Sequence, residues 1–310
     1  MVEFKNVSKT FKKKKTKVQA LKNLTFKIEQ GEIVTILGRN GAGKTTLIKC
    51  LCNIFIPDEG EIYINDLNTC KNNTNKEIAS VFEGARNIYW TLTPSENLEF
   101  FYRMKKGKKN PDLIDKYIKI FELEEKKNSI VSSLSRGMQQ KTAIACAFIQ
   151  DCPILVLDEP TLGLDIEFAA KMNKLIIDTA KETGKTIIIT THDMNLVNSS
   201  SDRIMILNDG EIIEFDYIDR LANLIETNYL KIKISSENSL NLERIINTSG
   251  LQFSIVNYNT YDEFQIEIKD ISQMVEVSTL IFSEKIYPNS ISVNNTDIEN
   301  LYIALLNKKI

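Results

Sequence analysis

The sequence predicts an α/β fold followed by a smaller α+β domain. Short apolar runs occur at residues 33–37, 154–157 and 187–189, and each has the length and composition of a strand buried on both faces. Apolar residues at helical spacing lie between such runs, most plainly over residues 93–150. Strands that alternate with helices favour a sheet with parallel strands that helices cover. After residue 216 the pattern changes, which predicts a second domain.

A glycine-rich loop follows the first apolar run. It has the pattern G-x-x-x-x-G-K-[ST], with an apolar helix opening behind it, and it comprises Gly38, Arg39, Asn40, Gly41, Ala42, Gly43, Lys44, Thr45 and the adjoining Thr46. Strand, glycine loop and helix in this order form a concave row of backbone N–H groups, which attracts phosphate oxygens. We expect Lys44 to reach the β and γ phosphates of a nucleotide and Thr45 to ligate Mg²⁺. A chance glycine turn would not have this strand and helix around it.

Charged side chains follow the two other apolar runs. One strand ends in the carboxylates Asp158 and Glu159, and the next ends at His192, the single histidine of the chain. Ligands of α/β sheets bind at the carboxyl ends of parallel strands. Two adjacent acids at such a place need a cation or a proton. We therefore expect a cation or a proton beside Asp158 and Glu159, with His192 on the same edge of the sheet.

Three weaker signals accompany this site. Ser135 and Gly137 precede an apolar helix whose N-terminus suits an anion, and Asp165 lies in a turn that leads into another helix. Phe11 stands just before four lysines at residues 12–15. An aromatic ring there can stack on an adenine, although such rings more often fill a core or a loop. The lysines favour a solvated hairpin loop, and attraction to anionic lipid or phosphate is the alternative.

Composition excludes several classes of protein. The 310 residues are 43% hydrophobic and 26% charged with a net charge of −2, so no overall positive charge favours nucleic acid. No charge-free stretch approaches the ~18 apolar residues of a membrane span, and the first residues lack a signal peptide. The five cysteines form no C-x-x-C pair, which argues against a zinc site or a disulfide framework. Cys50 and Cys146 lie in apolar helical patterns and are expected to be reduced core thiols, as in a cytoplasmic protein.

In their order along residues 1–216, these motifs resemble those of ABC transporter ATP-binding subunits. The resemblance identifies residues 134–138 (Leu-Ser-Arg-Gly-Met) with the signature motif and residues 162–165 with the D-loop. It also implies that Glu159 is the catalytic glutamate, that His192 is the switch histidine, and that Phe11 stacks on the adenine.

The same resemblance implies a mechanism and partners. Two cassettes, as a homodimer or a heterodimer, would pair head to tail, with ATP between the phosphate loop of one and Ser135 and Gly137 of the other. Mg²⁺ would bind Thr45, Asp158 and Glu83. A membrane-spanning subunit on a separate chain would insert a coupling helix into a groove next to Glu83, Arg86, Tyr89 and Trp90. The chain would then be cytoplasmic and held at the inner face of the membrane by that subunit, with drugs, peptides or lipids exported.

Two departures from the family pattern stand out. Glu83 occupies the place of a glutamine that touches Mg²⁺ and the attacking water, so the positioning of that water comes into question. The signature motif has Arg136 where glycine is commonest and Met138 where glutamine is, but it keeps Ser135 and Gly137.

The C-terminal part, residues 217–310, shows the order strand, helix, strand, strand, helix, strand. The predicted elements are residues 230–234, 242–248, 253–258, 264–268, 271–282 and 290–293. This order suggests a small ferredoxin-like domain. A last helix is expected to begin at Thr296, with Glu299 as its cap partner and Leu301, Tyr302, Leu305 and Leu306 on one face. The domain is either a structural appendage or a dimer-stabilising or regulatory element.

The main alternative is a soluble ABC ATPase of translation or DNA repair. Translation-type members carry two cassettes per chain, whereas this chain has one phosphate loop. Repair-type members divide the cassette with a long coiled coil, and no heptad run separates Lys44 from Asp158. A nucleotide-dependent clamp without catalysis is a second alternative because of Glu83, but the presence of Glu159 and His192 argues against it.

Overall fold

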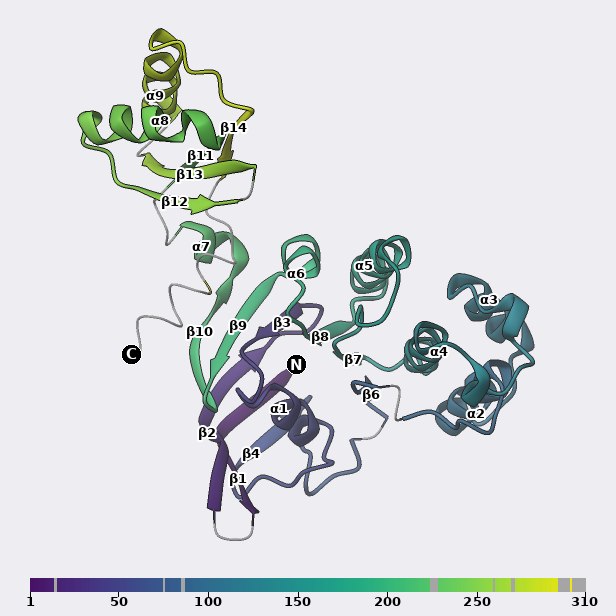
Figure 1. Ribbon diagram of the computed structural model, residues 1–310. Helices are drawn as coiled ribbons and strands as arrows, with labels where there is room; N and C mark the ends of the chain where they lie inside the picture. Colours follow the sequence, from purple (N-terminus) through teal and green to yellow (C-terminus); the bar gives the residue numbers. More distant parts are fainter. Residues whose placement is uncertain are drawn as a thin grey trace. The chain divides into compact units, whose positions relative to one another are not determined.

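Figure 1 shows the computed structural model of the chain, which describes residues 1–13, 16–74, 76–84, 87–223, 228–258, 260–268, 271–294 and 302. The chain forms two compact units, Met1–Ile218 and Asp219–Ile310. None of the described helices is both long and apolar enough to span a membrane.

A small antiparallel sheet begins the first unit. Its strand order is β2-β1-β4-β5, with bounds β1 Val2–Lys13, β2 Thr16–Ile28, β4 Glu59–Ile64 and β5 Leu67–Asn68. Strands β1 and β2 form a long hairpin, in which Phe11 pairs with Val18. Lys14 and Lys15 of the lysine run lie outside the described residues.

A six-stranded sheet forms the centre of the unit. Its order is β10-β9-β3-β8-β7-β6, with bounds β3 Ile33–Leu37, β6 Ile78–Val81, β7 Ile154–Asp158, β8 Thr186–Thr190, β9 Arg203–Asn208 and β10 Glu211–Tyr217. The neighbours from β6 to β9 run parallel, and only β10 is antiparallel. The carboxyl ends of β6, β7, β8 and β3 therefore meet at one edge, as the sequence predicted for the strand-end residues.

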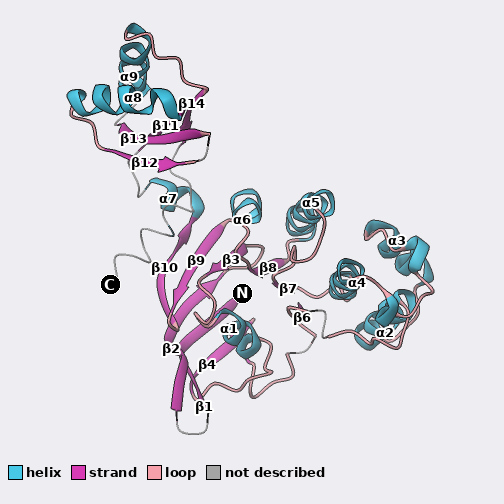
Figure 2. Ribbon diagram, viewed as in Figure 1, coloured by secondary structure: helices cyan, strands magenta, loops and turns pink. Residues whose placement is uncertain are grey.

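Helices surround this sheet. Their bounds are α1 Lys44–Leu51, α2 Pro94–Lys106, α3 Pro111–Ile120, α4 Arg136–Phe148, α5 Ile166–Thr183 and α6 Met194–Ser200, with 3₁₀ turns at Glu124–Lys126 and Val131–Ser133. A further helix, α7 Ile218–Asn223, begins at the last residue of the first unit and continues in the second. Helices α2, α3 and α4 lie together beyond β6 (Figure 2), which confirms the predicted helical region. The Thr93 side chain and Glu96 form a capping box at the start of α2, with Pro94 at the first helical position.

Alternate residues of the central strands face two different cores. On β7, Leu155 and Leu157 pack with the helical side, whereas Val156 packs with the antiparallel sheet and α1. Ile187 and Ile188 of β8 divide in the same way. This burial on both faces explains why the strands appear in the sequence as continuous apolar runs. Packing on both faces holds the sheet in place. It therefore also fixes the edge at which the carboxyl ends of the parallel strands carry the charged residues.

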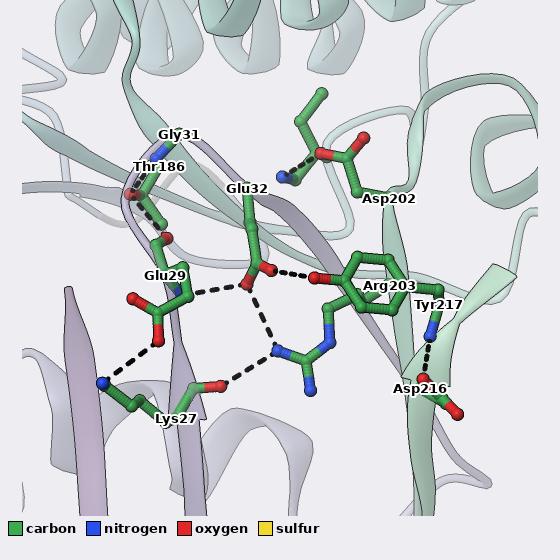
Figure 3. Close-up of polar contacts among 10 residues, drawn as sticks. Lys27, Glu29, Gly31, Glu32, Thr186, Asp202, Arg203, Asp216 and Tyr217 are labelled. Carbon is green, nitrogen blue, oxygen red and sulfur yellow. Dashed lines mark hydrogen bonds and ion pairs between the residues drawn. The ribbon is translucent and has the colours of Figure 1, made fainter.

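The opposite edge of the sheet carries a partly buried polar network (Figure 3). Glu32, which precedes β3, accepts hydrogen bonds from Arg203 Nη1 at 3.3 Å and from the Tyr217 hydroxyl at 3.3 Å. Arg203 also donates to the Lys27 carbonyl, and Asp202 accepts from the backbone N–H of Ile33 at 2.8 Å. The first residues of β3 and β9 and the last of β10 are thus joined.

The second unit has a four-stranded antiparallel sheet of order β12-β13-β11-β14. Its elements are β11 Asn228–Ser235, α8 Ser236–Ser249, β12 Phe253–Asn257, β13 Tyr261–Ile268, α9 Ile271–Ser283 and β14 Ser290–Asn294. This order and topology are those of a ferredoxin-like domain. Helix α8 begins six residues before the predicted start, and α7 was not predicted. Of the expected last helix, only Tyr302 lies within the described residues.

Candidate functional site

The glycine loop joins β3 to α1 and leaves the helix N-terminus open. Gly43 is the N-cap of α1 with φ +109, and within the described residues the helix has no side-chain capping hydrogen bond. A Cβ at Gly43 would lie 2.4 Å from the Ala20 carbonyl, so any other residue would be strained and would displace the backbone. Unpaired N–H groups at a helix N-terminus bind anions. The loop is therefore built to hold phosphate.

Lys44 lies folded over this loop. Its Nζ donates to the Gly38 carbonyl at 2.5 Å and to the Arg39 carbonyl at 3.4 Å. Burial lowers the pKa of Lys44, while the nearby carboxylates of Glu159, Asp158 and Glu83 act in the opposite direction. A phosphate group would give this ammonium a stronger partner than two carbonyl oxygens.

Asp158 ends β7 and is held by two hydroxyl groups. The buried Thr190 hydroxyl, on the neighbouring strand β8, donates to Oδ1, and the Thr45 hydroxyl lies 3.4 Å from Oδ2. Asp158 itself is 2% exposed. The carboxylate is thus fixed beside the phosphate loop, with Thr45 on the side of the nucleotide.

Glu159 turns sharply out of the strand. Its φ of +50 is left-handed, and its backbone N–H still bonds to the Thr190 carbonyl at 2.8 Å. The side chain accepts a hydrogen bond from the Thr191 hydroxyl at 3.3 Å and lies 2.9 Å from His192 Nδ1. Glu159 and His192, which the sequence placed on the same edge, are therefore in direct contact.

These groups line one cleft of about 270 Å³. The residues around it are Arg39, Asn40, Gly41, Ala42, Gly43, Lys44, Thr45, Thr46, Glu83, Asp158 and Glu159. Glu83 follows β6, so its place beside the others results from the strand order. The cleft combines a phosphate cradle, one ammonium group and three carboxylates.

The residues of the cleft fit a magnesium ion that a nucleotide brings with it. In the described part of the chain, no three His, Cys, Asp or Glu side chains gather closely enough to hold a metal ion alone. The Thr45 hydroxyl and Asp158 Oδ2 are hard oxygen ligands 3.4 Å apart at the mouth of the phosphate loop. Mg²⁺ commonly takes one or two carboxylate ligands and completes its shell with phosphate and water oxygens.

The segments expected to be the signature motif and the D-loop, residues 134–138 and 162–165, lie outside this cleft. Ser135 caps α4 by accepting from the Met138 N–H at 3.3 Å, and Asp165 caps α5 by accepting from the Phe168 N–H at 2.8 Å. That hydrogen bond lowers the pKa of Asp165. Gly137 approaches the D-loop, since a Cβ there would lie 3.0 Å from the Gly163 carbonyl. Neither Ser135, Gly137 nor Asp165 lines the cleft of the same chain.

Phe11 also lies outside the cleft. Its ring meets Phe55 edge to face, with centroids 5.2 Å apart, and Lys9 Nζ lies 5.7 Å from its centroid. Adenine stacking by Phe11 remains a prediction.

A second hollow lies along α2. It is lined by Leu92, Glu96, Glu99, Phe100, Arg103 and Met104. Tyr89 and Trp90 precede α2, and each is 47% exposed. The ring of Tyr89 packs against the ring of Phe100, with centroids 4.7 Å apart. Arg86, which the sequence placed in a partner groove, lies outside the described residues.

Sequence reasoning missed Thr190 and Thr191. Both are fully buried, and their hydroxyls hold Asp158 and Glu159 respectively. The available signal was a pair of hydroxyl residues at the end of an apolar strand, directly before His192.

Comparison with known proteins shows the family to which the chain is related. Residues 21–162 match the family of ABC transporters. The chain is 35% identical over 227 residues to a methionine import ATP-binding protein, MetN 4 of Oceanobacillus iheyensis, with 70% of this chain and 65% of that protein covered. It is 32% identical over 239 residues to the SkfA peptide export ATP-binding protein SkfE of Bacillus subtilis, with 76% of this chain and 98% of that protein covered. The match thus spans less than two thirds of MetN 4.

Solved structures show the same fold. A dimeric structure of the ATP-binding cassette MJ0796, in a post-hydrolysis state bound to ADP and Pi, superposes with a TM-score of 0.67 at 33% identity. It covers 70% of this chain and 99% of that one. With the phosphate loop, Asp158, Glu159 and His192 gathered on one edge, the chain belongs to the ABC transporter family and contains its ATP-binding cassette, the ATPase module of that family.

Proposed function

We propose that this chain is the ATP-binding and hydrolysing subunit of an ABC transporter and that two copies close around Mg²⁺-ATP. The observation that carries the proposal is the separation of the motifs. The phosphate loop and Glu159 line one cleft, whereas Ser135 and Gly137 lie outside it. A second copy placed head to tail would bring its Ser135 and Gly137 to the first copy's γ-phosphate. The dimeric cassettes among the solved neighbours support this arrangement.

Within such a dimer, the residues of the cleft have separate tasks. The loop N–H groups and Lys44 bind the phosphates, and Thr45 and Asp158 would hold the magnesium ion. Bound magnesium supplies positive charge that offsets the charge on the bridging oxygens. Glu159 polarises the attacking water, and His192, 2.9 Å from Glu159, contacts the edge of the γ-phosphate. Glu159, whose φ of +50 ends the extended strand, is one of the residues that line the cleft.

We further propose that the partner is a membrane-spanning subunit on a separate chain and that the transport is export. SkfE, whose name states peptide export, is matched over 98% of its length, compared with 65% for MetN 4. Tyr89, Trp90 and the hollow along α2 would receive a helix of that subunit, because exposed aromatic residues are enriched at interfaces. The subunit would hold this chain at the cytoplasmic face, and the second unit would stabilise the dimer or regulate it.

The variant Glu159→Gln tests the catalytic part of the proposal. We expect this variant to bind ATP but to hydrolyse it at least about 100-fold more slowly than the wild type, because the general base Glu159 is gone. The variant should be a dimer in the presence of ATP and a monomer without it. The double variant Glu159→Gln with Ser135→Ala is the matched control and should bind ATP but stay monomeric. Hydrolysis at the wild-type rate, or dimers that form equally well in the double variant, would contradict the proposal.

Co-purification tests the partner. Full-length protein expressed with its membrane subunit should bind that subunit, and Trp90→Ala should lose it while keeping ATP-dependent dimerisation. Leu240→Ala, which removes an exposed apolar residue of the second unit, is the control and should retain the subunit. Retention by the Trp90 variant would place the docking surface elsewhere. ATP-driven uptake of cargo into inside-out vesicles would establish export.

A further inference from the structure

One carboxylate joins helix α4, which begins at the signature motif, to helix α5, which begins at the D-loop. Glu122 lies in the turn after α3, and its Oε2 is 3.0 Å from Nζ of Lys141 on α4. Its Oε1 is 2.6 Å from Nζ of Lys171 on α5. These two lysines lower the pKa of Glu122, with Lys171 the larger cause. The three side chains come from three separate elements, so the contact is not a local helix pair.

The backbone holds Glu122 firmly in place. Its φ is +54, a left-handed conformation that is uncommon for this residue type. Phe121 and Leu123 on either side are fully buried, and the Leu123 N–H bonds to the Ile118 carbonyl at 2.9 Å. A carboxylate carried by such a turn moves only if the core beneath it moves.

Lys141 also contacts α5 directly, through the ring of Phe168. It is 8% exposed, and its Nζ lies 3.6 Å from the centre of the Phe168 ring. Phe168 is the residue whose N–H completes the Asp165 cap, and it is 3% exposed. An ammonium group this buried needs a counter-charge, and Glu122 provides it together with the ring face.

A third contact lies one helical turn away on the same face of α4. Gly137 and Lys141 are four residues apart, so they point in the same direction. Gly137 meets the Gly163 carbonyl, and Lys141 meets Phe168. Gly163 and Phe168 lie on either side of Asp165. The first turns of α4 are therefore held against Gly163 of the D-loop and against Phe168 in the first turn of α5, one on each side of Asp165 in the sequence.

We propose that Glu122 and Lys141 are positioning residues that hold the signature motif and the D-loop as one block, so that both enter the nucleotide interface of a second copy together. The inference rests on the dimer of the proposed function. Because Ser135 and Gly137 lie at the N-terminus of α4 and Asp165 at that of α5, a loosened α4–α5 contact lets one motif meet the partner without the other. Binding of ATP to a single copy does not involve this block.

The test uses full-length protein that carries Glu159→Gln, in which ATP-bound dimers persist. The variants Glu122→Gln, Lys141→Met, Lys141→Arg and the double Glu122→Gln with Lys141→Met are compared. Glu167→Gln is the matched control, since Glu167 is the other carboxylate on Lys171, at 3.0 Å, and does not reach Lys141. Analytical ultracentrifugation gives the dimer dissociation constant, and a fluorescent ATP analogue gives the affinity of the monomer.

We expect Glu122→Gln and Lys141→Met each to raise the dimer dissociation constant about tenfold relative to the parent protein. Their affinity for ATP should stay within about twofold of that of the parent. The double variant should be no worse than either single one, because both remove the same link. Lys141→Arg and the control should dimerise like the parent. Glu122→Gln dimers as tight as those of the control would overturn the inference. So would parallel losses of ATP affinity, dimerisation and thermal stability, which indicate general destabilisation.

Hydrogen exchange of the monomer gives a second readout. Glu122→Gln should speed exchange in residues 135–139 and 161–168 together, whereas the control should not. If the parent stays monomeric in ATP, the proposed dimer fails, and the exchange result alone then decides the α4–α5 link. Unchanged exchange in both segments would refute that link.

Discussion

The Thr190 hydroxyl donates a hydrogen bond to Oδ1 of Asp158 across the pair of strands β7 and β8. Thr190 is fully buried, so no water molecule can replace its hydroxyl without a rearrangement. The other carboxylate oxygen remains available on the side of Thr45. The strand pairing therefore sets the orientation of the one buried acid of the cleft.

Thr190→Val should weaken the binding of Mg²⁺ in the ATPase reaction more than it weakens the binding of the nucleotide. Valine keeps the shape but leaves Oδ1 without its donor, a loss of about 1–3 kcal/mol. We expect the Mg²⁺ concentration for half-maximal ATPase activity to rise about tenfold. Thr35→Val is the control, because Thr35 is equally buried but bonds to Ser201. Identical magnesium titrations for both variants would refute the role of Thr190.

Lys44→Ala should lower ATP affinity about 100-fold, the upper range for hydrogen bonds to a charged group. Equilibrium binding of a fluorescent ATP analogue measures the loss. Lys49→Ala removes an ammonium group from the same helix beyond the cleft and should bind normally. Unaltered binding by the Lys44 variant would contradict the phosphate-loop assignment.

Glu83→Gln should retain Mg²⁺-ATP binding, because the phosphate loop, Thr45 and Asp158 remain in place. The hydrolysis rate then shows what the natural carboxylate does. A faster rate identifies Glu83 as a brake on the attacking water, and a changed magnesium dependence identifies it as a metal ligand. Loss of nucleotide binding in this variant is the outcome that would show a structural role instead.

The cysteines should differ in reactivity. Burial raises the pKa of both Cys50 and Cys52 to about 12 and that of Cys146 well above its usual range, whereas Cys70 is exposed. The thiolate is the reactive form, so a thiol reagent at pH 8 should label Cys70 first.

The raised pKa values also predict how stability depends on pH, because the folded state binds the thiol protons of Cys50 and Cys52 more tightly than the unfolded state does. Their contribution to stability is therefore complete below pH 9 and falls as the pH rises from 9 toward 12. Mass spectrometry of labelled peptides and urea unfolding against pH check both points.

Glu32→Gln should destabilise the first unit by about 2–4 kcal/mol, since it leaves the Arg203 guanidinium without its charged partner. The two side chains are 11% and 16% exposed. Lys27→Met breaks a pair with Glu29 in which both side chains are about half exposed, and it should cost about 1 kcal/mol or less. Urea denaturation measures both variants, and equal losses would show that the network adds nothing beyond a surface pair.

The sequence allowed prediction of those features whose cause is local. The glycine loop depends on neighbouring residues of the sequence, and the structure has it between β3 and α1. The contacts of Thr190 with Asp158 and of Lys141 with Glu122 join residues 32 and 19 positions apart. They depend on strand order and helix packing, which no local pattern contains. Helix α7 was missed because its six residues are too few to show a period.

The network around Glu32 also has a consequence for how such a chain can change over time. The Ile218 N–H bonds to the Asp202 carbonyl at 3.1 Å, so the first unit closes upon itself at its final residue. That closure lies at the amino ends of β3 and β9, away from the nucleotide edge. Every residue that lines the cleft precedes Ile218, so the sequence after Ile218 can diverge between descendants of one cassette without changing the lining of the cleft itself.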